Sequence, residues 1–264
     1  MPVPGGTLVW DAIDLTPPWL AEPSTVILHH GLGTNAEMWA SWLPVLATRH
    51  RVVRFDMRGA GRSSRLPAGE PLSLERFRDD LLAVADAAGA NRFHLIGESF
   101  GGTVALFTAA TARERLLSVT TIASPHRGAT MRILDGWQEL SDAPESLRAW
   151  SQRMMGWRFR DDAVPPAAWD WFRAVQDETD PAFVRGLAAL VRPLDLGPRL
   201  AGLDLPVLLL APDSSPFVEA QLVSELHGLL PNSALQVFAG TKHGLAFSHG
   251  EACAQVFVGR REGW

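Results

Sequence analysis

The feature that most constrains this chain is the pentapeptide at residues 97–101, which reads Gly-Glu-Ser-Phe-Gly. It lies between an apolar run at residues 93–96 and a stretch of small residues that opens at Gly101. Glycines two residues before and two residues after Ser99 allow a sharp turn from strand into helix, because Gly97 and Gly101 have no Cβ atoms to collide in the bend. Such a turn raises the serine hydroxyl above the sheet and directs a helix N-terminus toward it. Ser99 is therefore a candidate nucleophile.

The composition limits the classes of protein to which the chain can belong. Its 264 residues can form one large domain, or one domain that carries an insertion. With 47% hydrophobic and 20% charged residues it resembles soluble globular proteins. The net charge of −5 argues against a surface for nucleic acid. We find no signal-peptide pattern and no apolar run that approaches the roughly 18 residues of a membrane span. The lone Cys253 cannot form an internal disulfide. We therefore expect a cytoplasmic protein without membrane or nucleic-acid partners.

Short β-branched runs alternate with longer amphipathic runs, which is typical of β-α-β units and a mostly parallel sheet flanked by helices. This pattern predicts the α/β fold class. The predicted strands are residues 25–30, 51–55, 93–96, 119–123, 206–211 and 234–238. The predicted helices are residues 38–48, 74–85, 102–113 and 217–230, with another from about residue 245.

The alternation stops between residues 125 and 203, where aromatic and methionine residues accumulate without a convincing strand. The tryptophans of this stretch are Trp137, Trp150, Trp157, Trp169 and Trp171. We expect a helical insertion that packs a small core of its own and covers the C-terminal edge of the sheet. The predicted organisation is a core of residues 1–124 and 204–264 and a cap (lid) of residues 125–203.

A serine nucleophile requires a general base, which a third group orients. In a parallel sheet such side chains gather where the strands end. His243 follows the strand that ends at residue 238 and is the best candidate for the base. His249 is the alternative, although we expect it on the next helix. We expect His94, inside a strand, to be a core residue, and His50 and His227 to be structural.

Asp213 is the candidate for the third group, because it follows the strand at residues 206–211. Asp204 precedes that strand and Glu219 lies on the next predicted helix, so neither reaches the same edge of the sheet. The alternative for Asp213 is a structural role in capping a turn.

Three further motifs accompany the serine turn. They are His-Gly-Leu-Gly at residues 30–33, Asp-Met-Arg-Gly-Ala-Gly-Arg-Ser at 56–63 and Gly-Thr-Lys-His at 240–243. Together with the order Ser99, Asp213, His243, they resemble the α/β-hydrolase superfamily over nearly the full length of the chain. The resemblance implies the α/β-hydrolase fold and a catalytic triad. It also implies an oxyanion hole built from the backbone N–H groups of Leu32 and Phe100, with His30 as a structural prop of its loop.

The chain departs from the family pattern at the acid. The family usually places this residue three positions after the small residue that ends the strand. Counted from Ala211, that position is Ser214, and Asp213 falls one residue early. Either the loop is shifted by one residue or the acid assignment is wrong.

The absence of certain residues narrows the reaction. Serine rather than aspartate at position 99 disfavours dehalogenases and epoxide hydrolases, and the chain contains no tyrosine for the lid of the latter. No group of His, Cys, Asp and Glu has metal-ligand spacing, so we expect no metal. The glycines at residues 31–33 resemble a dinucleotide loop, but that pattern breaks at Ala36, so we expect no cofactor.

We therefore expect a serine hydrolase of a small carboxylic ester or lactone that forms an acyl-enzyme on Ser99. Residues 31–39 and 54–59 resemble 3-oxoadipate enol-lactonases and carboxylesterase-type members of the superfamily. If the substrate is an anion, cap arginines such as Arg127, Arg132 or Arg153 are candidates to meet it. One alternative is a hydrolase of carbon–carbon bonds in β-diketones or ring-cleavage products that uses the same three residues. Another is a receptor-like binder with little turnover.

Overall fold

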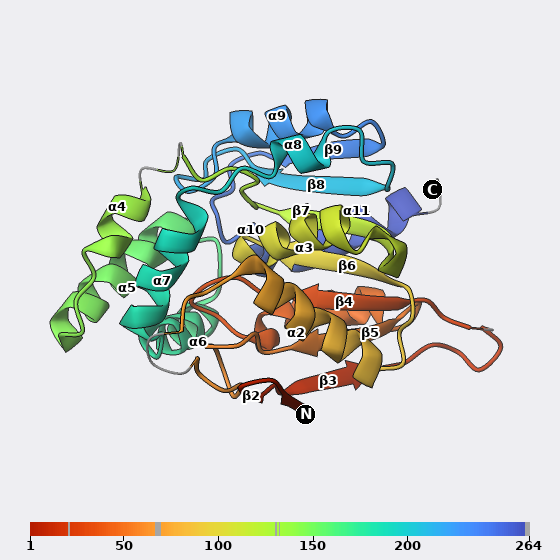
Figure 1. Cartoon of the computed structure of the whole chain (residues 1–264), viewed down its shortest axis with the longest axis horizontal. Coiled ribbons are helices and arrows are strands. Elements are labelled where there is room, and N and C mark those ends of the chain that lie inside the picture. Colours follow the sequence, from red (N-terminus) through yellow and green to blue (C-terminus); the bar gives the residue numbers. More distant parts are fainter. Residues whose placement is uncertain (21, 67–69, 130, 132, 262–264) are drawn as a thin grey trace.

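The computed structural model describes residues 1–20, 22–66, 70–129, 131 and 133–261, and in them a central sheet has the strand order β3-β5-β4-β6-β7-β8-β9 (Figure 1). The strands are β3 (Trp10–Ile13), β4 (Thr25–His29), β5 (Arg51–Phe55), β6 (Phe93–Glu98), β7 (Leu116–Ile122), β8 (Val207–Pro212) and β9 (Ser233–Phe238). β4 to β9 pair in parallel. The α/β class predicted from the alternation is confirmed.

Strand residues alternate between two hydrophobic cores, as the pleat of a β-strand requires. In β4, Ile27 belongs to one core, whereas Val26 and Leu28 belong to the other. Leu209 and Leu210 of β8 divide in the same way. Both faces of the sheet are therefore buried, which explains the nearly continuous apolar runs of these strands.

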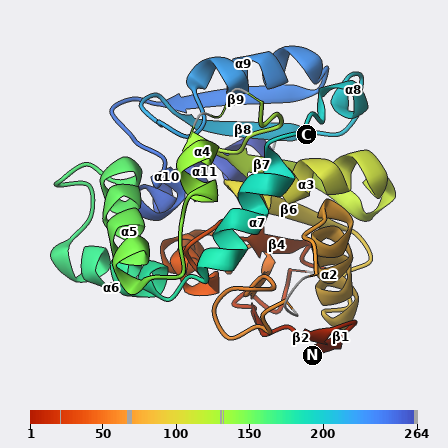
Figure 2. The ribbon, with the colours of Figure 1, turned by 60° about the vertical axis from the view of Figure 1, so that its left-hand side comes forward.

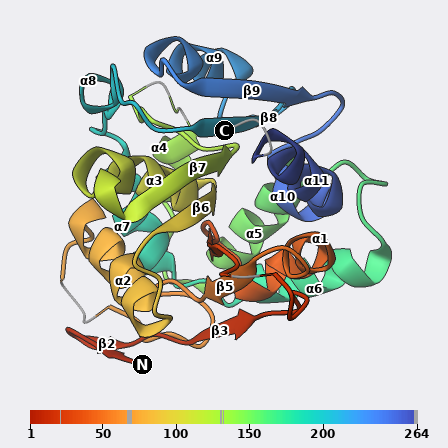
Figure 3. The same cartoon turned by 90° about the vertical axis from the view of Figure 1, so that its right-hand side faces the viewer.

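Helices cover each face of the sheet (Figure 3). On one face lie α2 (Leu74–Ala87), α3 (Phe100–Thr111) and α9 (Ala220–Leu229). On the other lie the 3₁₀ helix η1 (Ala36–Trp42), α1 (Leu43–Leu46), α10 (Leu245–Ser248) and α11 (Gly250–Arg261). A short 3₁₀ turn, η2 (Arg113–Arg115), precedes β7. The sequence predicts one helix over residues 38–48, but the structure forms η1 there, followed by a single turn of α-helix that has Pro44 near its start.

The sequence pattern does not predict the three short N-terminal strands. β3 pairs antiparallel with β5 at the edge of the sheet, and β1 (Pro2–Val3) and β2 (Gly6–Thr7) form a small separate ribbon. Segments as short as these are too brief for their hydrophobic period to be recognised, and their pairing depends on the distant strand β5.

The described residues between β7 and β8 form the helices α4 (Ile133–Gln138), α5 (Pro144–Arg158), α6 (Pro166–Asp177), α7 (Pro181–Val191) and α8 (Gly197–Leu200). Figure 2 shows α4 to α7 together in front of the sheet, at the end where its parallel strands finish. These helices include the tryptophan-rich stretch, and Trp137 and Trp150 are buried in it. The division into core and cap at residues 125 and 203 stays a prediction.

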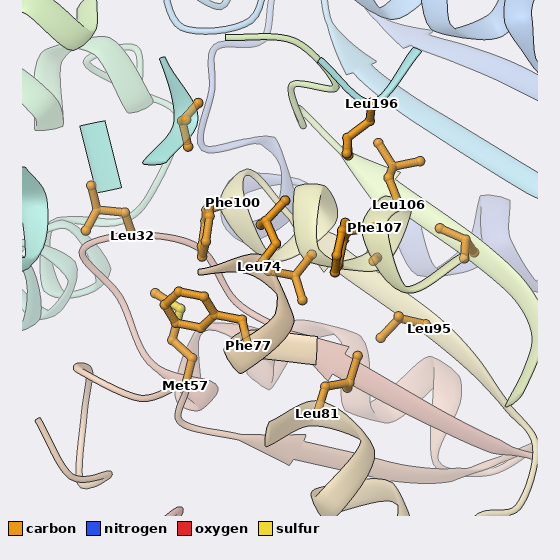
Figure 4. Packing of buried hydrophobic residues seen from close by; sticks show 14 of the residues in the cluster. Leu32, Met57, Leu74, Phe77, Leu81, Leu95, Phe100, Leu106, Phe107 and Leu196 are labelled. Atoms are coloured by element: carbon orange, nitrogen blue, oxygen red, sulfur yellow. The ribbon is translucent and has the colours of Figure 1, made fainter. Parts of the chain in front are cut away.

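Helix α3 is held in place through its first residue. The Phe100 side chain is 5% exposed, and its ring lies 4.9 Å from that of Phe77, edge to face. Figure 4 shows Phe100 on α3 near Phe77 and Leu74 of α2. Phe100 directly follows Ser99, so packing between α2 and α3 fixes the backbone on the C-terminal side of the serine.

The motif at residues 56–63, which follows β5, holds the N-terminal residues against α2. Arg58 is fully buried and donates to both carboxylate oxygens of Asp80, at 2.8 and 2.6 Å, and also to the carbonyls of Pro4 and Gly5. Its guanidinium is thus occupied by structural contacts. A buried pair of this kind depends on both partners, because a single buried charge is costly.

We predict that Asp80→Asn lowers the free energy of unfolding by about 3–5 kcal/mol, because it leaves the Arg58 charge buried without a counter-charge. Asp86→Asn is the matched control on the same helix, since Asp86 pairs with Arg115 but is 65% exposed. The control should cost less than about 1 kcal/mol. Urea unfolding of the two variants measures the difference, and equal losses would contradict the prediction.

Candidate active site

Ser99 lies in a strained turn between β6 and α3. Its backbone has φ 52° and ψ −119°, a conformation that residues other than glycine rarely adopt. A Cβ at position 97 would collide with the backbone of Gly101, and a Cβ at Gly101 would collide with the carbonyl of His29. The glycines predicted to permit the bend therefore do so by close backbone approach, and the strain is borne at the serine.

His243 meets Ser99, as predicted. Its Nε2 lies 2.9 Å from the Ser99 Oγ, although the two residues are 144 positions apart. The imidazole is 2% exposed and lies 4.3 Å, centroid to centroid, from the ring of Phe217. Burial, and then the charge of Arg158, hold the pKa of His243 well below its ordinary value. The ring is therefore neutral near pH 7 and can accept a proton from Ser99. His249 is exposed, and its Nδ1 contacts Ser248.

The expectation that Asp213 orients His243 needs correction. The Asp213 carboxylate is exposed, and it accepts hydrogen bonds from the backbone of Gly240 and Thr241, at 2.8 and 3.1 Å, and from the Ser214 hydroxyl. These donors hold the pKa of Asp213 below its usual value. Asp213 thus supports the loop that carries His243 but does not touch the imidazole. The turn-capping alternative describes it better.

Ser215 lies against Nδ1 of His243, where the carboxylate of the acid was expected. Its Oγ lies 3.2 Å from Nδ1 of His243 and accepts the N–H groups of Phe217 and Val218, both at 3.2 Å. The chain after β8 continues to pair with the loop after β9, through Asp213 to Phe238 and Ser214 to Thr241, before it turns inward. The residue that reaches the imidazole is therefore two positions later than predicted, and it carries no charge.

The loop after β4 lies against Ser99. A Cβ at Gly31 would come within 2.9 Å of the Ser99 Cβ, so the backbone of this loop passes directly over the serine. His30 accepts the Met57 N–H at Nε2, at 2.9 Å, and its Nδ1 lies 2.8 Å from the Gly31 carbonyl. Burial lowers the pKa of His30, so the ring stays neutral. These contacts suit the predicted role of His30 as a prop of the loop that contains Leu32.

Glu98 is a buried acidic residue beside Ser99, and it faces the buried cation Arg158. Glu98, the residue before the serine, is 1% exposed, and burial raises its pKa to about 7 against the opposing effects of Arg158 and the Gly31 backbone. Its Oε1 lies 3.8 Å from an Nη atom of Arg158 and 3.8 Å from Nε2 of His243. Its Oε2 fills the space that a side chain at position 31 would need.

Arg158 ends α5 and links the helices between β7 and β8, α4 to α8, here called the cap helices, to the loops beside the serine. Its guanidinium donates to the Leu32 carbonyl and to Oε1 of Gln176, the latter at 3.0 Å. Its own carbonyl accepts the Gly244 N–H at 2.9 Å, next to His243. One residue of the cap helices thus contacts both loops that flank the serine.

Comparison with known proteins identifies the family. The family model described as the alpha/beta hydrolase fold matches residues 24–166. The chain belongs to the α/β-hydrolase family. A relative from Variovorax paradoxus named putative carbamate hydrolase RutD is 30% identical over 212 residues, which cover 72% of this chain and 74% of that protein. A 3-oxoadipate enol-lactonase from Acinetobacter baylyi is 26% identical, with 72% and 71% covered. The crystal structure of an enol-lactonase from Burkholderia xenovorans has a TM-score of 0.86 at 21% identity and covers 97% and 96%.

Two of the three arginines suggested as anion ligands have other partners in this α/β hydrolase. Arg127 pairs with Glu225 at 2.6 Å, and Arg153 is exposed over the ring of Trp157. Arg132 lies outside the described residues. Among the described residues, the arginine that lies beside Glu98 and donates to the Leu32 carbonyl is Arg158, and no sequence pattern distinguishes it from the other arginines of residues 125–203. Glu98, in contrast, is part of the motif, so its closeness to Ser99 could have been inferred.

A cavity of about 280 Å³ adjoins the α/β-hydrolase site. It lies between the loop after β4, the turn after β5 and the helices α6 and α7, and both Leu32 and Gly33 line it. Ser99 and His243 are not among its lining residues, and the cavity is related to the serine through the loop after β4, whose Gly31 lies against Ser99. In the described ranges no helix is long and apolar enough to cross a bilayer, and no group of His, Cys, Asp and Glu is arranged to hold a metal ion.

As the pH rises, the buried histidines increase the stability of the folded protein, whereas Glu98 decreases it. Burial lowers the pKa values of His29 (to about 3), His30, His126 and His243, so the unfolded chain takes up protons below about pH 6.5 and stability falls with falling pH. The pKa of Glu98 is about 7 in the folded protein, against 4.5 for an exposed carboxyl group. Its contribution to stability is therefore fully present below pH 4.5 and is lost as the pH rises through 7.

We therefore predict that Glu98→Gln makes the free energy of unfolding climb more steeply from pH 5 to pH 7 than in the wild type. The difference corresponds to at most one proton, about 1.4 kcal/mol per pH unit. Urea unfolding at pH 5, 6 and 7 measures it. Glu251→Gln removes an exposed carboxylate and is the control: its free energy of unfolding should change with pH as that of the wild type does. A Glu98→Gln curve that is also parallel would refute the prediction.

Proposed function

We propose that this α/β hydrolase is a cofactor-independent serine hydrolase that cleaves a small carboxylic ester or lactone through an acyl-enzyme on Ser99. The observation that carries the proposal is the 2.9 Å approach of the Ser99 Oγ to Nε2 of His243, at a strained turn that opens helix α3. A hydroxyl, a neutral base and a helix N-terminus at one point support nucleophilic attack on a carbonyl carbon.

In the first half-reaction the Ser99 Oγ attacks the carbonyl carbon while its proton passes to Nε2 of His243. The tautomer that accepts this proton carries its own on Nδ1, which lies 3.2 Å from the Ser215 Oγ. Negative charge develops on the former carbonyl oxygen, and the backbone N–H groups of Leu32 and Phe100 are the proposed donors to it. Such donors contribute about 3 kcal/mol each where they have been measured. His243 then protonates the leaving alcohol, or the ring oxygen of a lactone.

In the second half-reaction water repeats the attack on the acyl carbon. His243 removes a proton from the water, the tetrahedral intermediate occupies the same oxyanion site, and the Ser99 oxygen leaves with the proton that His243 returns. Every step uses water and side chains or backbone groups of this chain. The cavity beside Leu32 and Gly33 offers space next to the site for a small substrate.

A carbamate is the second candidate substrate, because the relative at 30% identity is named a putative carbamate hydrolase. A carbamate carbonyl can be attacked in the same way as an ester carbonyl. The two candidates differ in the leaving group and in the electron donation from nitrogen. Rates for p-nitrophenyl acetate, a short lactone and a simple alkyl carbamate, compared as kcat/KM, distinguish them. A β-diketone in the same panel tests for carbon–carbon bond hydrolysis.

We predict that Ser99→Ala abolishes hydrolysis of p-nitrophenyl acetate, because no acyl-enzyme can form. A fluorophosphonate probe should label the wild type at Ser99, as seen by peptide mass spectrometry, and should leave the variant unlabelled. Activity that survives in Ser99→Ala would require another nucleophile. Labelling of the wild type without turnover of any substrate would favour the receptor-like alternative.

We predict that Asp213→Asn keeps kcat/KM within about threefold of the wild type, because the amide oxygen can still accept one of the loop N–H groups. Loss of a carboxylate that contacts the histidine of a triad costs about 10⁴-fold in kcat. The measurement therefore distinguishes an Asp213 that supports the loop from an Asp213 that orients His243. A loss of a hundredfold or more would show that Asp213 reaches His243 during the reaction.

A further inference from the structure

The histidine of the proposed site has no carboxylate at its usual orienting position. Nδ1 of His243 contacts the hydroxyl of Ser215, which already accepts two backbone N–H groups. A hydroxyl carries no charge, so it does not offset the positive charge that the ring gains when it takes the Ser99 proton. The ring is buried, so water compensates that charge poorly.

A carboxylate is present on the opposite side of the imidazole. Within the described ranges, the acidic group within ion-pair distance of His243 is Glu98, whose Oε1 lies 3.8 Å from Nε2. Both side chains are nearly inaccessible, at 2% for Glu98 and 3% for His243, which strengthens their electrostatic interaction. Glu98 comes from strand β6, immediately before the serine.

We propose that Glu98 is a positioning residue that replaces the missing acid: its carboxylate stabilises the His243 imidazolium from the Nε2 side while Ser99 attacks. This inference rests on the proposed function. The proton moves from the Ser99 Oγ to Nε2 and later to the leaving group, and Glu98 neither gains nor loses a proton during the cycle. Its contribution is a negative charge beside the ring.

The groups that surround Glu98 determine when that charge is present. From α5 it is faced by Arg158, from the loop after β9 by His243, and from the loop after β4 by the Gly31 backbone. Burial raises the pKa of Glu98 to about 7, and Arg158 opposes the rise. The carboxyl group is therefore increasingly ionised as the pH rises through 7, whereas His243 is already neutral. kcat/KM should rise through an inflection near pH 7 that belongs to Glu98.

The test moves the carboxylate from one side of the imidazole to the other. Glu98→Gln keeps the size of the side chain and removes its charge; we expect kcat/KM at pH 8.5 to fall about a hundredfold and the inflection near pH 7 to disappear. Adding Ser215→Asp places a carboxylate against Nδ1, where the Ser215 Oγ now lies 3.2 Å away. We expect this double variant to recover at least tenfold. Ser215→Asn in the same background is the matched neutral control and should recover nothing.

Ser215→Asp alone provides a second measurement that leaves Glu98 intact. It should raise kcat/KM more at pH 6.5, where Glu98 is largely protonated, than at pH 8.5. The rate at which a fluorophosphonate labels Ser99 should follow the same pattern, because labelling also requires His243 as base. Urea unfolding establishes that each variant is folded.

The outcomes separate this inference from the proposed function. If the wild type shows no hydrolysis or labelling that depends on Ser99, the proposed function fails. If the wild type is active but Glu98→Gln keeps both its rate and its pH inflection, the role of Glu98 is refuted. It is equally refuted if Ser215→Asp and Ser215→Asn have the same effect in the Glu98→Gln background, since a purely structural loss would not respond to charge at position 215.

Discussion

The strained backbone at Ser99 is the constraint on which the rest of the site depends. A φ of 52° at a residue with a side chain is unfavourable, and it persists because strand β6 enters the turn on one side and α3 leaves it on the other. Phe100, packed against Phe77, anchors the helix directly after the serine. The glycines at 97 and 101 allow the two backbones to approach. Small residues remove the steric barrier, and core packing compensates for the strain that remains.

The charges around Ser99 are arranged differently from a triad in which a carboxylate contacts Nδ1. Ser215 takes that place as a neutral hydroxyl, and Asp213, the acid nearest in sequence, holds the backbone of the following loop. The buried carboxylate belongs to Glu98, and the buried cation, Arg158, comes from the end of α5. Both are out of water, so each interacts strongly with the imidazole between the two loops. The site therefore couples the serine turn to the cap helices by electrostatics as well as by packing.

Much of the molecule could be predicted because its signals are local. The parallel strands β4 to β9 and the helices between them follow from runs of apolar residues with a recognisable period, and the turn at Ser99 follows from the spacing of its glycines. The approach of His243 to Ser99 was predictable because parallel strands bring their C-terminal ends to one edge of the sheet. β3 was missed because a short edge strand depends on its distant partner β5.

The amino-acid order was enough to place most of the core elements, the turn that carries Ser99 and the histidine that contacts it, because each depends on residues close together in the chain or on the geometry of a parallel sheet. Which side chain reaches Nδ1 of His243 depends on contacts between loops that are distant in the chain. A loop can present Asp213, Ser214 or Ser215 at the same point, and its pairing with the loop after β9 selects Ser215. The tertiary structure also decided which arginine enters the site, since Arg158 is placed by contacts with Leu32 and Gly244, far from it in sequence.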